Sequence, residues 1–368
     1  MKKTTIALFA AAALPFAVQA ANTEFTYGGF IKADASLTQY QYKAGSQFDN
    51  KFYIPGAMPT QGTEVANGNN LQMHTDLRSS RFNFGTKTTF DNGEVVSSFI
   101  ELDFLGAAGD TAAAVNSYAP RIRHAYLSYN NLLIGHTWST FMNVAALPES
   151  ADLIGPSDGT VFKRTDQVRY TLGGLQLALE NSFSSFDDGQ TLCGTINCGQ
   201  GAKHGTIPDV IARYNFNVSD NTSLSAAALF HNEQDFDSDK NKAGFGVNVA
   251  GVIKLGSDNI KLSVSHGDGI RNYVGVGQAA LMDGKDLNTI TAGFVSYQHF
   301  WSPQVRSSLT YSMLDSEAKW KSDSARINLM YSPVDKLTYG VEYSHAQVDK
   351  AGDKGSFDRL HLTAKFAF

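Results

Sequence analysis

The sequence is poor in proline and cysteine, and after its first twenty residues it contains no long apolar run. It has 9 prolines and 2 cysteines among 368 residues. A membrane-spanning helix needs roughly 20 consecutive apolar residues, and no stretch after residue 20 is long enough. Long Leu/Ala/Glu patterns of the kind that form helices are also missing. These absences argue against helices as the main structural element of the chain.

An excess of positive charge is absent as well, since 30 Lys and Arg residues stand against 35 Asp and Glu residues. The first twenty residues, MKKTTIALFAAAALPFAVQA, have the paired lysines, the apolar run and the small-residue end of a secretory signal peptide. We expect cleavage after Ala20, which leaves residues 21–368 as one exported domain. An acidic exported protein is not expected to bind nucleic acid.

Glycine and aromatic residues are abundant instead, with 33 Gly, 24 Phe and 15 Tyr. Segments in which apolar and polar residues alternate recur from Phe25 to the C-terminus, and we count about sixteen of them. The last, RLHLTAKFAF, places Leu360 and Leu362 on one face and His361 and Thr363 on the other. Successive side chains of a strand point to opposite sides, so each such segment is predicted to be a strand with one apolar and one polar face.

The connections between these segments alternate in length. The short ones, such as DNG, NN, GG and GSD, have the composition of tight turns. The longer, polar ones span residues 39–75, 105–118, 141–164, 182–208, 232–242, 267–287, 313–323 and 346–356. A short and long alternation is typical of an up-and-down membrane barrel with short periplasmic turns and long outer loops.

The polar faces carry too many charged residues for a closed, dry core, because buried charges without partners are very costly. The lumen is therefore expected to be wet and the apolar faces to meet lipid. The fold class predicted is all-β: a transmembrane up-and-down antiparallel β-barrel of about sixteen strands. The strand that ends at Phe368 is predicted to close the barrel against the strand near Phe25. An apolar strand ending in an aromatic residue resembles the signal that the barrel assembly machinery reads.

Positively charged residues gather on the predicted lumen faces. We expect the following to line the pore and to attract anions: Lys32, Arg81, Arg121, Arg123, Arg164, Arg169, Arg213, Arg306 and Arg326. The planar guanidinium group of arginine can engage both oxygens of a carboxylate. The alternative is that these residues only pair with acids of facing strands and solvate the wall.

One long connection, around residues 139–164, is too apolar to extend into water. We expect it to fold into the barrel as a constriction loop, with Glu149, Asp152 and Asp158 facing the arginine-bearing strands across the narrowest point. The alternatives are that it packs on a neighbouring subunit or caps the barrel from outside.

Catalytic and metal sites are not expected. The histidines on predicted strands have no nucleophile motif beside them, so the protein is not expected to be an enzyme. Cys193 and Cys198 lie in one glycine-rich connection, and a small disulfide is favoured in an exported chain. A metal site would need more ligands than this pair and His204 offer, and no cofactor is expected. The first alternating segment begins close to Ala21, which leaves no room for the plug domain of a gated transporter.

The chain resembles the DcaP-like porins of Gram-negative bacteria in blocks that occur in order: TDLRSSRFNFGTKTTFDNGE, FIELDFLGAAGD, NSYAPRIRHAYLSYNNLLIGHTWSTF, ALPESADLIGPSDGTVFKRTDQVRYT and LQLALEN. The resemblance is densest over residues 75–182. It implies an outer-membrane homotrimer of sixteen-stranded barrels that passes small solutes, with dicarboxylic acids as the substrate class. Unlike the family's namesake, this chain has no coiled-coil heptads before Phe25.

The function predicted is therefore passive diffusion of small, preferentially anionic solutes through a loop-narrowed lumen in the outer membrane, with membrane lipid outside. A general porin, in which the arginines only set the field across the pore, is the first alternative. A structural or adhesive barrel blocked by its loops is the second.

Overall fold

The computed structural model describes residues 21–44, 52–106, 119–184, 203–204, 207–235, 240–275 and 287–368. The predicted signal peptide and the pair Cys193 and Cys198 lie outside these residues. Within the described residues, no helix is long and apolar enough to cross a membrane.

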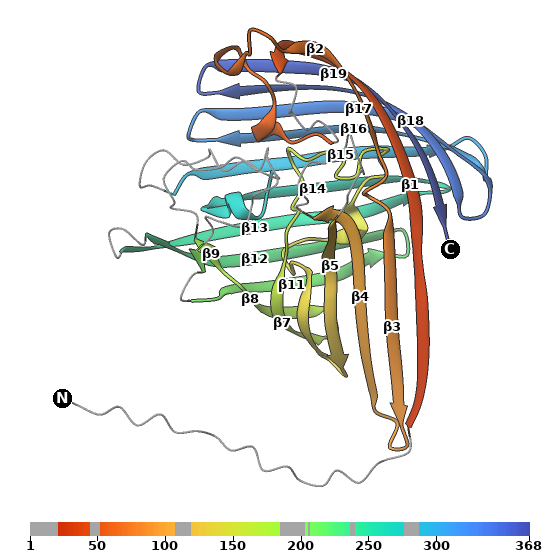
Figure 1. The fold of residues 1–368 in the computed structure, drawn as a ribbon. Helices are drawn as coiled ribbons and strands as arrows, with labels where there is room; N and C mark the ends of the chain where they lie inside the picture. Colours follow the sequence, from red (N-terminus) through yellow and green to blue (C-terminus); the bar gives the residue numbers. More distant parts are fainter. Residues whose placement is uncertain are drawn as a thin grey trace.

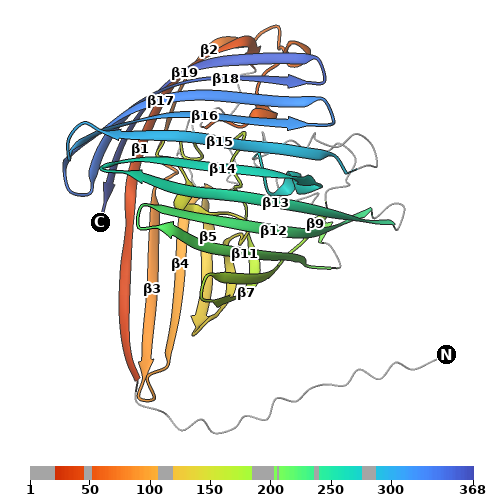
Figure 2. The same cartoon turned by 180° about the vertical axis from the view of Figure 1, so that it is seen from behind.

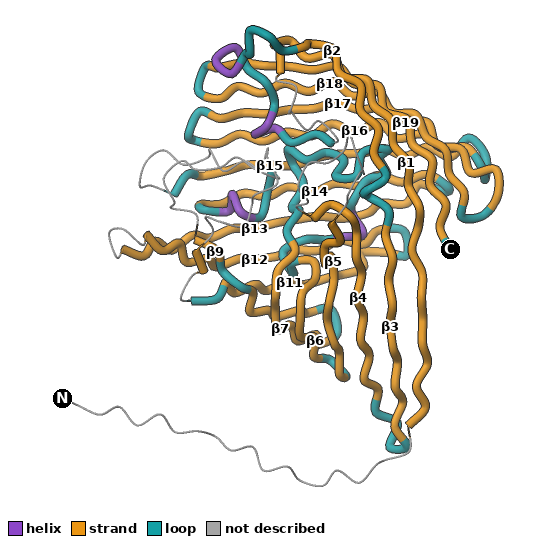
Figure 3. Tube along the Cα trace, in the orientation of Figure 1, coloured by secondary structure: helices purple, strands orange, loops and turns teal. Residues whose placement is uncertain are grey.

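Strands make up almost the whole of this structure (Figures 1 and 3). They are β1 (Ala21–Ala44), β2 (Asn69–Asp76), β3 (Arg81–Phe90), β4 (Val95–Gly106), β5 (Ala119–Tyr129), β6 (Leu132–Trp138), β7 (Arg164–Leu172), β8 (Leu175–Glu180), β9 (Phe183–Ser184), β10 (Lys203–His204), β11 (Asp209–Ser219), β12 (Thr222–Asp235), β13 (Lys240–Leu255), β14 (Asp258–Asp268), β15 (Thr289–Phe300), β16 (Val305–Ser316), β17 (Trp320–Val334), β18 (Leu337–Lys350) and β19 (Asp353–Ala367). Four short 3-10 helices lie in the connections: η1 (Pro55–Ala57), η2 (Gln61–Thr63), η3 (Val144–Ala146) and η4 (Ile270–Asn272).

The strands close into one antiparallel barrel. Each strand from β3 to β8 and from β11 to β19 pairs with the next, β8 pairs with β11, and β19 pairs with β1. On its other side β1 pairs with β2 along residues 34–44 and with β3 along residues 21–30. β2 and β3 pair with successive halves of β1 and together count as one strand of the ring. The barrel therefore has sixteen strands. The predicted fold class is confirmed.

The two walls of the barrel are seen from opposite sides in Figures 1 and 2. Figure 1 shows β1, β3, β4 and β5 side by side in front, and Figure 2 shows β11–β18 in front. The short turns, such as those between β5 and β6 and between β7 and β8, lie at one end of the strands. Four of the predicted long connections are wrong in extent, because strands occupy part of them. The predicted connection 39–75 contains the end of β1 and nearly all of β2, and 232–242 contains the end of β12 and the start of β13. The connections 313–323 and 346–356 are short turns, because β16 ends at Ser316, β17 begins at Trp320, β18 ends at Lys350 and β19 begins at Asp353.

The faces of the strands alternate as the sequence predicts. In β19, Leu360 and Leu362 are exposed on the outside, whereas Arg359, His361 and Thr363 are buried inside. An apolar exterior and a polar interior are what a barrel in lipid requires.

The chain end completes the closure. The backbone N–H of Phe368 donates to the carbonyl oxygen of Gly29 over 3.1 Å, and its ring lies 5.7 Å from that of Phe82. Gly29 has φ +149°, and a Cβ there would lie 2.1 Å from the carbonyl oxygen of Arg81. Only glycine allows β1 and β3 to approach this closely.

Candidate pore constriction

The connection of residues 139–163, between β6 and β7, folds into the barrel (Figures 1 and 3). Its first residues are anchored by apolar side chains. Phe141 and Met142 are buried against Ile211 of β11, and the ring of Phe141 lies 5.6 Å from that of Tyr273. Burial of such side chains is favourable by about 2 kcal/mol each, so this loop is fixed to the wall at its start.

The outgoing arm of the loop then follows the inner wall from strand to strand. Asn143 Nδ2 donates to Ser225 Oγ of β12 over 2.8 Å, and Lys261 Nζ of β14 donates to the carbonyl oxygen of Leu147 over 2.7 Å. Asn328 Nδ2 of β17 donates to the carbonyl oxygen of Glu149 over 2.9 Å. Wall side chains thus satisfy loop backbone groups that would otherwise lack partners.

Glu149 forms the best-defined ion pair of the loop. Both of its oxygens accept from Arg306 of β16, from Nη2 and Nε, over 2.6 Å each, and Gln298 Nε2 donates to it over 2.7 Å. This bidentate geometry is the strong form of an arginine–carboxylate contact. The arginine and the acid therefore neutralise each other.

A second buried acid, Glu342 of β18, receives the next loop residues. Ser150 Oγ and the backbone N–H of Ala151 donate to its carboxylate over 2.8 and 3.1 Å. Arg326 of β17 lies 3.5 Å from the same carboxylate. Lys32 of β1 donates to the carbonyl oxygen of Ala151 over 2.9 Å and pairs with Asp34. Arg326 and Lys32 thus hold the loop and are both beside an acid.

Asp152 and Asp158 lie where the loop turns back. Asp152 accepts from the backbone N–H of Tyr53 over 3.0 Å and lies 3.7 Å from Arg359 of β19. Asp158 is fully buried and accepts from Tyr53 Oη over 2.6 Å and from Ser324 Oγ over 2.5 Å. Burial raises the pKa of the Asp158 carboxyl above its ordinary value, and burial beside that acid raises the pKa of Tyr53.

Tyr53 belongs to a second inward loop, residues 52–63, which sequence reasoning missed. The rings of Tyr53 and Phe357 lie 5.2 Å apart, and Met58 is buried in the same cluster. Lys350 Nζ donates to the carbonyl oxygens of Gly56 and Met58 over 2.9 Å each. This loop therefore covers the turn of loop 139–163 and holds it against β17 and β19.

The returning arm packs backbone against backbone on β15 and β16. Gly159 N–H donates to Ser312 Oγ over 2.8 Å, and a Cβ at Gly159 would lie 2.0 Å from the carbonyl oxygen of Gly293. Farther along, Phe162 N–H donates to the carbonyl oxygen of Tyr273 over 3.0 Å. The second arm is thus as closely fitted to the wall as the first.

The end of the loop is fixed by the buried carboxylate of Asp209 on β11. It accepts from His231 Nδ1 and from Tyr273 Oη over 2.5 Å each, and Lys163 Nζ lies 3.4 Å away. Glu180, beside it on β8, accepts from the backbone N–H of Thr140 over 2.6 Å. Both ends of loop 139–163 are therefore tied to buried acids of β8 and β11.

The loop thus lines the inner wall from β11 to β19 and β1, and the wall formed by β3, β4, β5 and β7 carries a separate arginine cluster. Arg121 donates to Asp103 through Nε and Nη2 over 3.0 and 2.7 Å. Arg123, only 1% exposed, lies 2.8 Å from Glu101 and 3.0 Å from Asp103. Arg81 lies 3.6 Å from Glu101.

Arg164, at the start of β7, completes this cluster. Its guanidinium carbon lies 4.8 Å from the ring centroid of Trp138, and no acid among the described residues forms an ion pair with it. Among the described residues, three arginines therefore pair with the two carboxylates of Glu101 and Asp103, and Arg164 lies beside them without an ion pair. The cluster therefore contains more arginines than carboxylates.

The other two arginines expected in the pore lie on the same side, farther from this cluster. Arg169 of β7 faces inward without an ion pair among the described residues. Arg213 of β11 donates to Gln176 over 2.5 Å and to the carbonyl oxygen of Met142. Arg213 thus fixes the start of loop 139–163.

The loop acids differ from expectation in their partners. Glu149 and Asp152 contact Arg306 and Arg359 behind the loop, and Asp158 contacts hydroxyl groups. None of the three forms an ion pair with the arginines of β3, β5 and β7 in the described part of the chain. The expectation that the acids face those strands across the pore is therefore corrected, because the acids are used to dock the loop.

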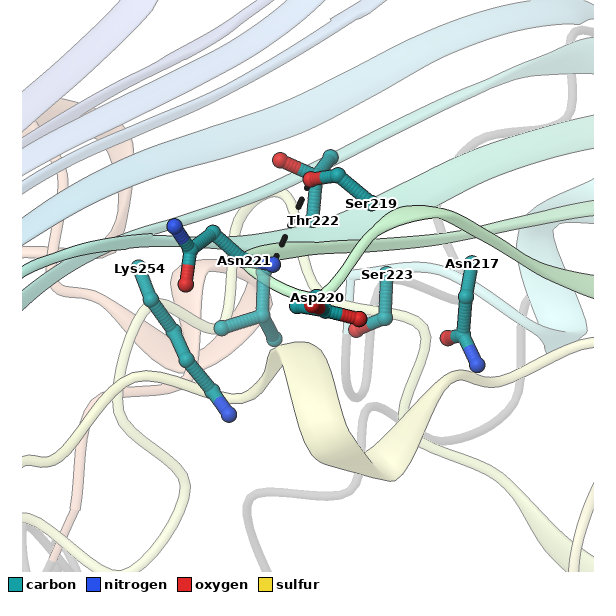
Figure 4. Close-up of a pocket in the computed structure, with 8 residues that line it drawn as sticks. Asn217, Ser219, Asp220, Asn221, Thr222, Ser223 and Lys254 are labelled. Atoms are coloured by element: carbon teal, nitrogen blue, oxygen red, sulfur yellow. Dashed lines mark hydrogen bonds between the residues drawn. The ribbon is translucent and has the colours of Figure 1, made fainter.

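A polar hollow of about 330 Å³ lies at the opposite end of the barrel, at the β11–β12 turn (Figure 4). Its lining includes Asn217, Ser223, Asp220 and Lys254, so charges of both signs are present. It shares no residue with the arginine cluster. Within the described residues, no group of three or more His, Cys, Asp and Glu side chains is arranged to hold a metal ion.

A closed sixteen-stranded barrel with an inward loop and a charged lumen defines a porin-type channel. The family model described as DcaP outer membrane protein matches residues 12–368, so the chain belongs to the DcaP family of outer membrane proteins. The outer membrane channel DcaP of Acinetobacter baumannii is similar in structure, with a TM-score of 0.77 and 27% sequence identity over 94% of this chain and 97% of that one.

Two solved structures of lower sequence identity share the fold. The anion-selective porin of Comamonas acidovorans has a TM-score of 0.58 at 11% identity, over 94% of this chain and 100% of that one. OmpT of Vibrio cholerae has a TM-score of 0.56 at 9% identity, over 94% and 99%. No curated protein matches the chain.

Proposed function

We propose that this porin prefers small anionic solutes, including dicarboxylates, and passes them by diffusion along the wall of β3, β4, β5 and β7. The observation that carries the proposal is the excess of arginine there: in the described part of the chain, Arg81, Arg121, Arg123 and Arg164 lie beside the two acids Glu101 and Asp103. A fixed excess of charge in a narrow aqueous path raises the local concentration of ions of the opposite sign.

The docking of the loop supports the same preference. Glu149 is neutralised by Arg306, and Asp158 is buried with a raised pKa. The loop therefore brings little negative charge to the solute path. Guanidinium groups also suit repeated weak capture of carboxylates.

The related proteins supply the remaining parts of the proposal. OmpT of V. cholerae is described in a trimer form, and we propose a homotrimer of this chain in outer-membrane lipid. We further propose cleavage of the signal peptide after Ala20, insertion by the barrel assembly machinery through the strand ending in Phe368, and no enzymatic activity. A general porin is the alternative, in which the same arginines leave ion selectivity unchanged.

Planar-bilayer reversal potentials in a salt gradient test the proposal. Arg81→Gln with Arg164→Gln removes the two arginines that lack a close carboxylate, since Glu101 keeps Arg123 at 2.8 Å. The matched control removes two outward-facing cations, by Lys321→Gln with Lys354→Gln, whose side chains are 62% and 71% exposed.

We expect the wild type and the control to prefer anions equally, and the arginine variant to lose most of that preference in low salt. The difference should shrink in 1 M salt, where the Debye length is about 3 Å. A wild type without anion preference, or an arginine variant that keeps it, would favour the general porin.

A further inference from the structure

The positive groups of the inner wall are held in two different ways. Arg121 and Arg123 are held by Asp103 and Glu101, and Arg306 is held by Glu149. A carboxylate partner fixes the position of a guanidinium group but also cancels its charge. Such residues shape the wall and add little to the attraction of an anion.

Arg81 and Lys365 both lie beside an aromatic ring. The guanidinium carbon of Arg81 lies 5.1 Å, and Lys365 Nζ 4.7 Å, from the centroid of the Phe30 ring. The ring attracts cations through its quadrupole but carries no net charge. Phe30 therefore gathers two cations in one place without neutralising either of them.

The strand register brings the three residues together from distant parts of the sequence. Phe30 of β1 is paired with Arg81 of β3 on one side and with Ala367 of β19 on the other. Lys365, two residues before Ala367, shares the inward face of β19 with His361 and Thr363 and is exposed to the lumen.

The remaining partners of the two cations are few. Arg81 lies 3.6 Å from Glu101, which is more closely paired with Arg123, and its buried Nε has no hydrogen-bond partner. Lys365 forms no ion pair with an acid in the part of the chain that the structure describes. Its electrostatic neighbours include Arg81, Lys32 and Arg306, with Glu149 as the acid.

We infer that Arg81, Lys365 and Phe30 form an anion subsite, in which one carboxylate group of a solute bridges the ammonium and guanidinium groups. This inference rests on the proposed anion preference and assigns it to particular residues. Lys365 is then a specificity-determining residue contributed by the C-terminal strand. The ring of Phe30 provides no negative charge, so the carboxylate of the solute takes the place of an acid side chain. It forms charge-assisted hydrogen bonds with Arg81 and Lys365.

Block of single-channel current by succinate tests the subsite in the full-length protein reconstituted in planar bilayers. Lys365→Gln removes one of the two cations. Lys87→Gln is the matched control. Lys87 shares the inward face of β3 with Arg81, and its replacement removes the same charge as Lys365→Gln. Phe30→Leu keeps an apolar side chain and the formal charge but removes the π face.

We expect Lys365→Gln to raise the half-blocking succinate concentration about tenfold or more, as for one lost charge-assisted hydrogen bond. Phe30→Leu should raise it about twofold and leave the reversal potential unchanged. Lys87→Gln should leave block nearly as in the wild type. Heat-modifiable gel mobility verifies that each variant is folded.

Equal effects of Lys365→Gln and Lys87→Gln, or no effect of either, would overturn the subsite. If the wild type still prefers anions in that case, only the subsite fails. If the wild type shows no anion preference at all, the proposed function fails with it.

Discussion

Replacement of Asp158 is expected to release loop 139–163 from the wall in a way that depends on the replacing side chain. Asp158 is fully buried at the turn of the loop and accepts hydrogen bonds from Tyr53 and Ser324. Asp158→Ala removes both acceptors and leaves two buried hydroxyl groups to find other partners. Each lost bond costs about 1 kcal/mol, so docking of the loop should weaken by about 2 kcal/mol.

Asp158→Asn should be nearly neutral. Burial raises the pKa of Asp158, which means that the fold favours the uncharged carboxyl, and the asparagine side chain is a neutral group of the same shape. Its oxygen can accept from Tyr53, and its amide can donate to the hydroxyl oxygen of Ser324.

The raised pKa also gives the pH dependence a definite sign. The docked loop binds the proton more tightly than the undocked loop, so docking is strongest below the ordinary aspartate pKa of about 3.9. It weakens as the pH rises from there to the raised pKa of the docked state, and then stays constant. The asparagine variant has no proton to lose at this site and should not show this dependence.

Cysteine labelling measures the docking directly. Ala151 belongs to the loop and is buried against the wall, so Ala151→Cys should react with a water-soluble maleimide only when the loop opens. Reaction at an exposed Lys321→Cys corrects for the pH dependence of the thiol. A loss of about 2 kcal/mol corresponds to labelling about thirtyfold faster in the alanine variant. Unchanged labelling in Asp158→Ala, or equally fast labelling in Asp158→Asn, would refute the reasoning.

Two further predictions concern packing and buried charge. Gly159→Ala places a Cβ about 2.0 Å from the carbonyl oxygen of Gly293, so the returning arm should move toward the lumen and lower the single-channel conductance; an unchanged conductance would show that the wall gives way instead. Arg123→Gln should lower the temperature of barrel unfolding, read from heat-modifiable gel mobility, far more than Arg121→Gln. Arg123 is 1% exposed between two carboxylates, whereas the Arg121 side chain is 40% exposed, and an uncompensated buried charge costs about 3 kcal/mol or more. Equal effects of these two substitutions would contradict the assignment.

The strands within the membrane could be predicted from sequence because lipid imposes a strict alternation on them. Outward residues such as Leu360 and Leu362 must be apolar, and inward residues such as His361 and Thr363 can be polar. The tight turns could also be predicted, from their Gly, Asn and Asp content.

The same rule explains why the ends of β16 to β19 were read as loops. Beyond the part of the barrel that faces lipid, the outward face no longer has to be apolar. Asp315 and Lys321 form an ion pair there at 2.7 Å on the exposed side. The backbone ladder nevertheless continues to Ser316 opposite Trp320. In these strand ends the alternation is inverted, because Leu314, Trp320 and Val348 are buried inside while the outward face is polar. The ends therefore lack the apolar outward face by which the membrane-spanning strands are recognised.

The inward position of loop 139–163 was predictable from its apolar residues, but the partners of its acids were not. Tyr53 and Asp158 are 105 positions apart in sequence, and their contact depends on a second loop that has no periodic pattern. Strand register could have suggested the pairing of Asp103 with Arg121, although an irregularity after Glu101 shifts that register by one residue. Contacts between side chains of two different loops can be identified only in the folded structure.

These partners decide what the positive charge of the lumen can do. A count of cations along the strands treats Arg123, Arg306 and Arg81 alike, because each lies on an inward face. In the folded barrel the first two are neutralised by carboxylates at 3.0 Å or less, whereas Arg81 lies 3.6 Å from Glu101 and beside the ring of Phe30. Anion preference should therefore follow from the groups held by aromatic rings, and the number of arginines should predict it poorly. In related barrels, exchange of an aromatic residue for an acid beside an inward cation would then abolish the preference without removing any positive charge.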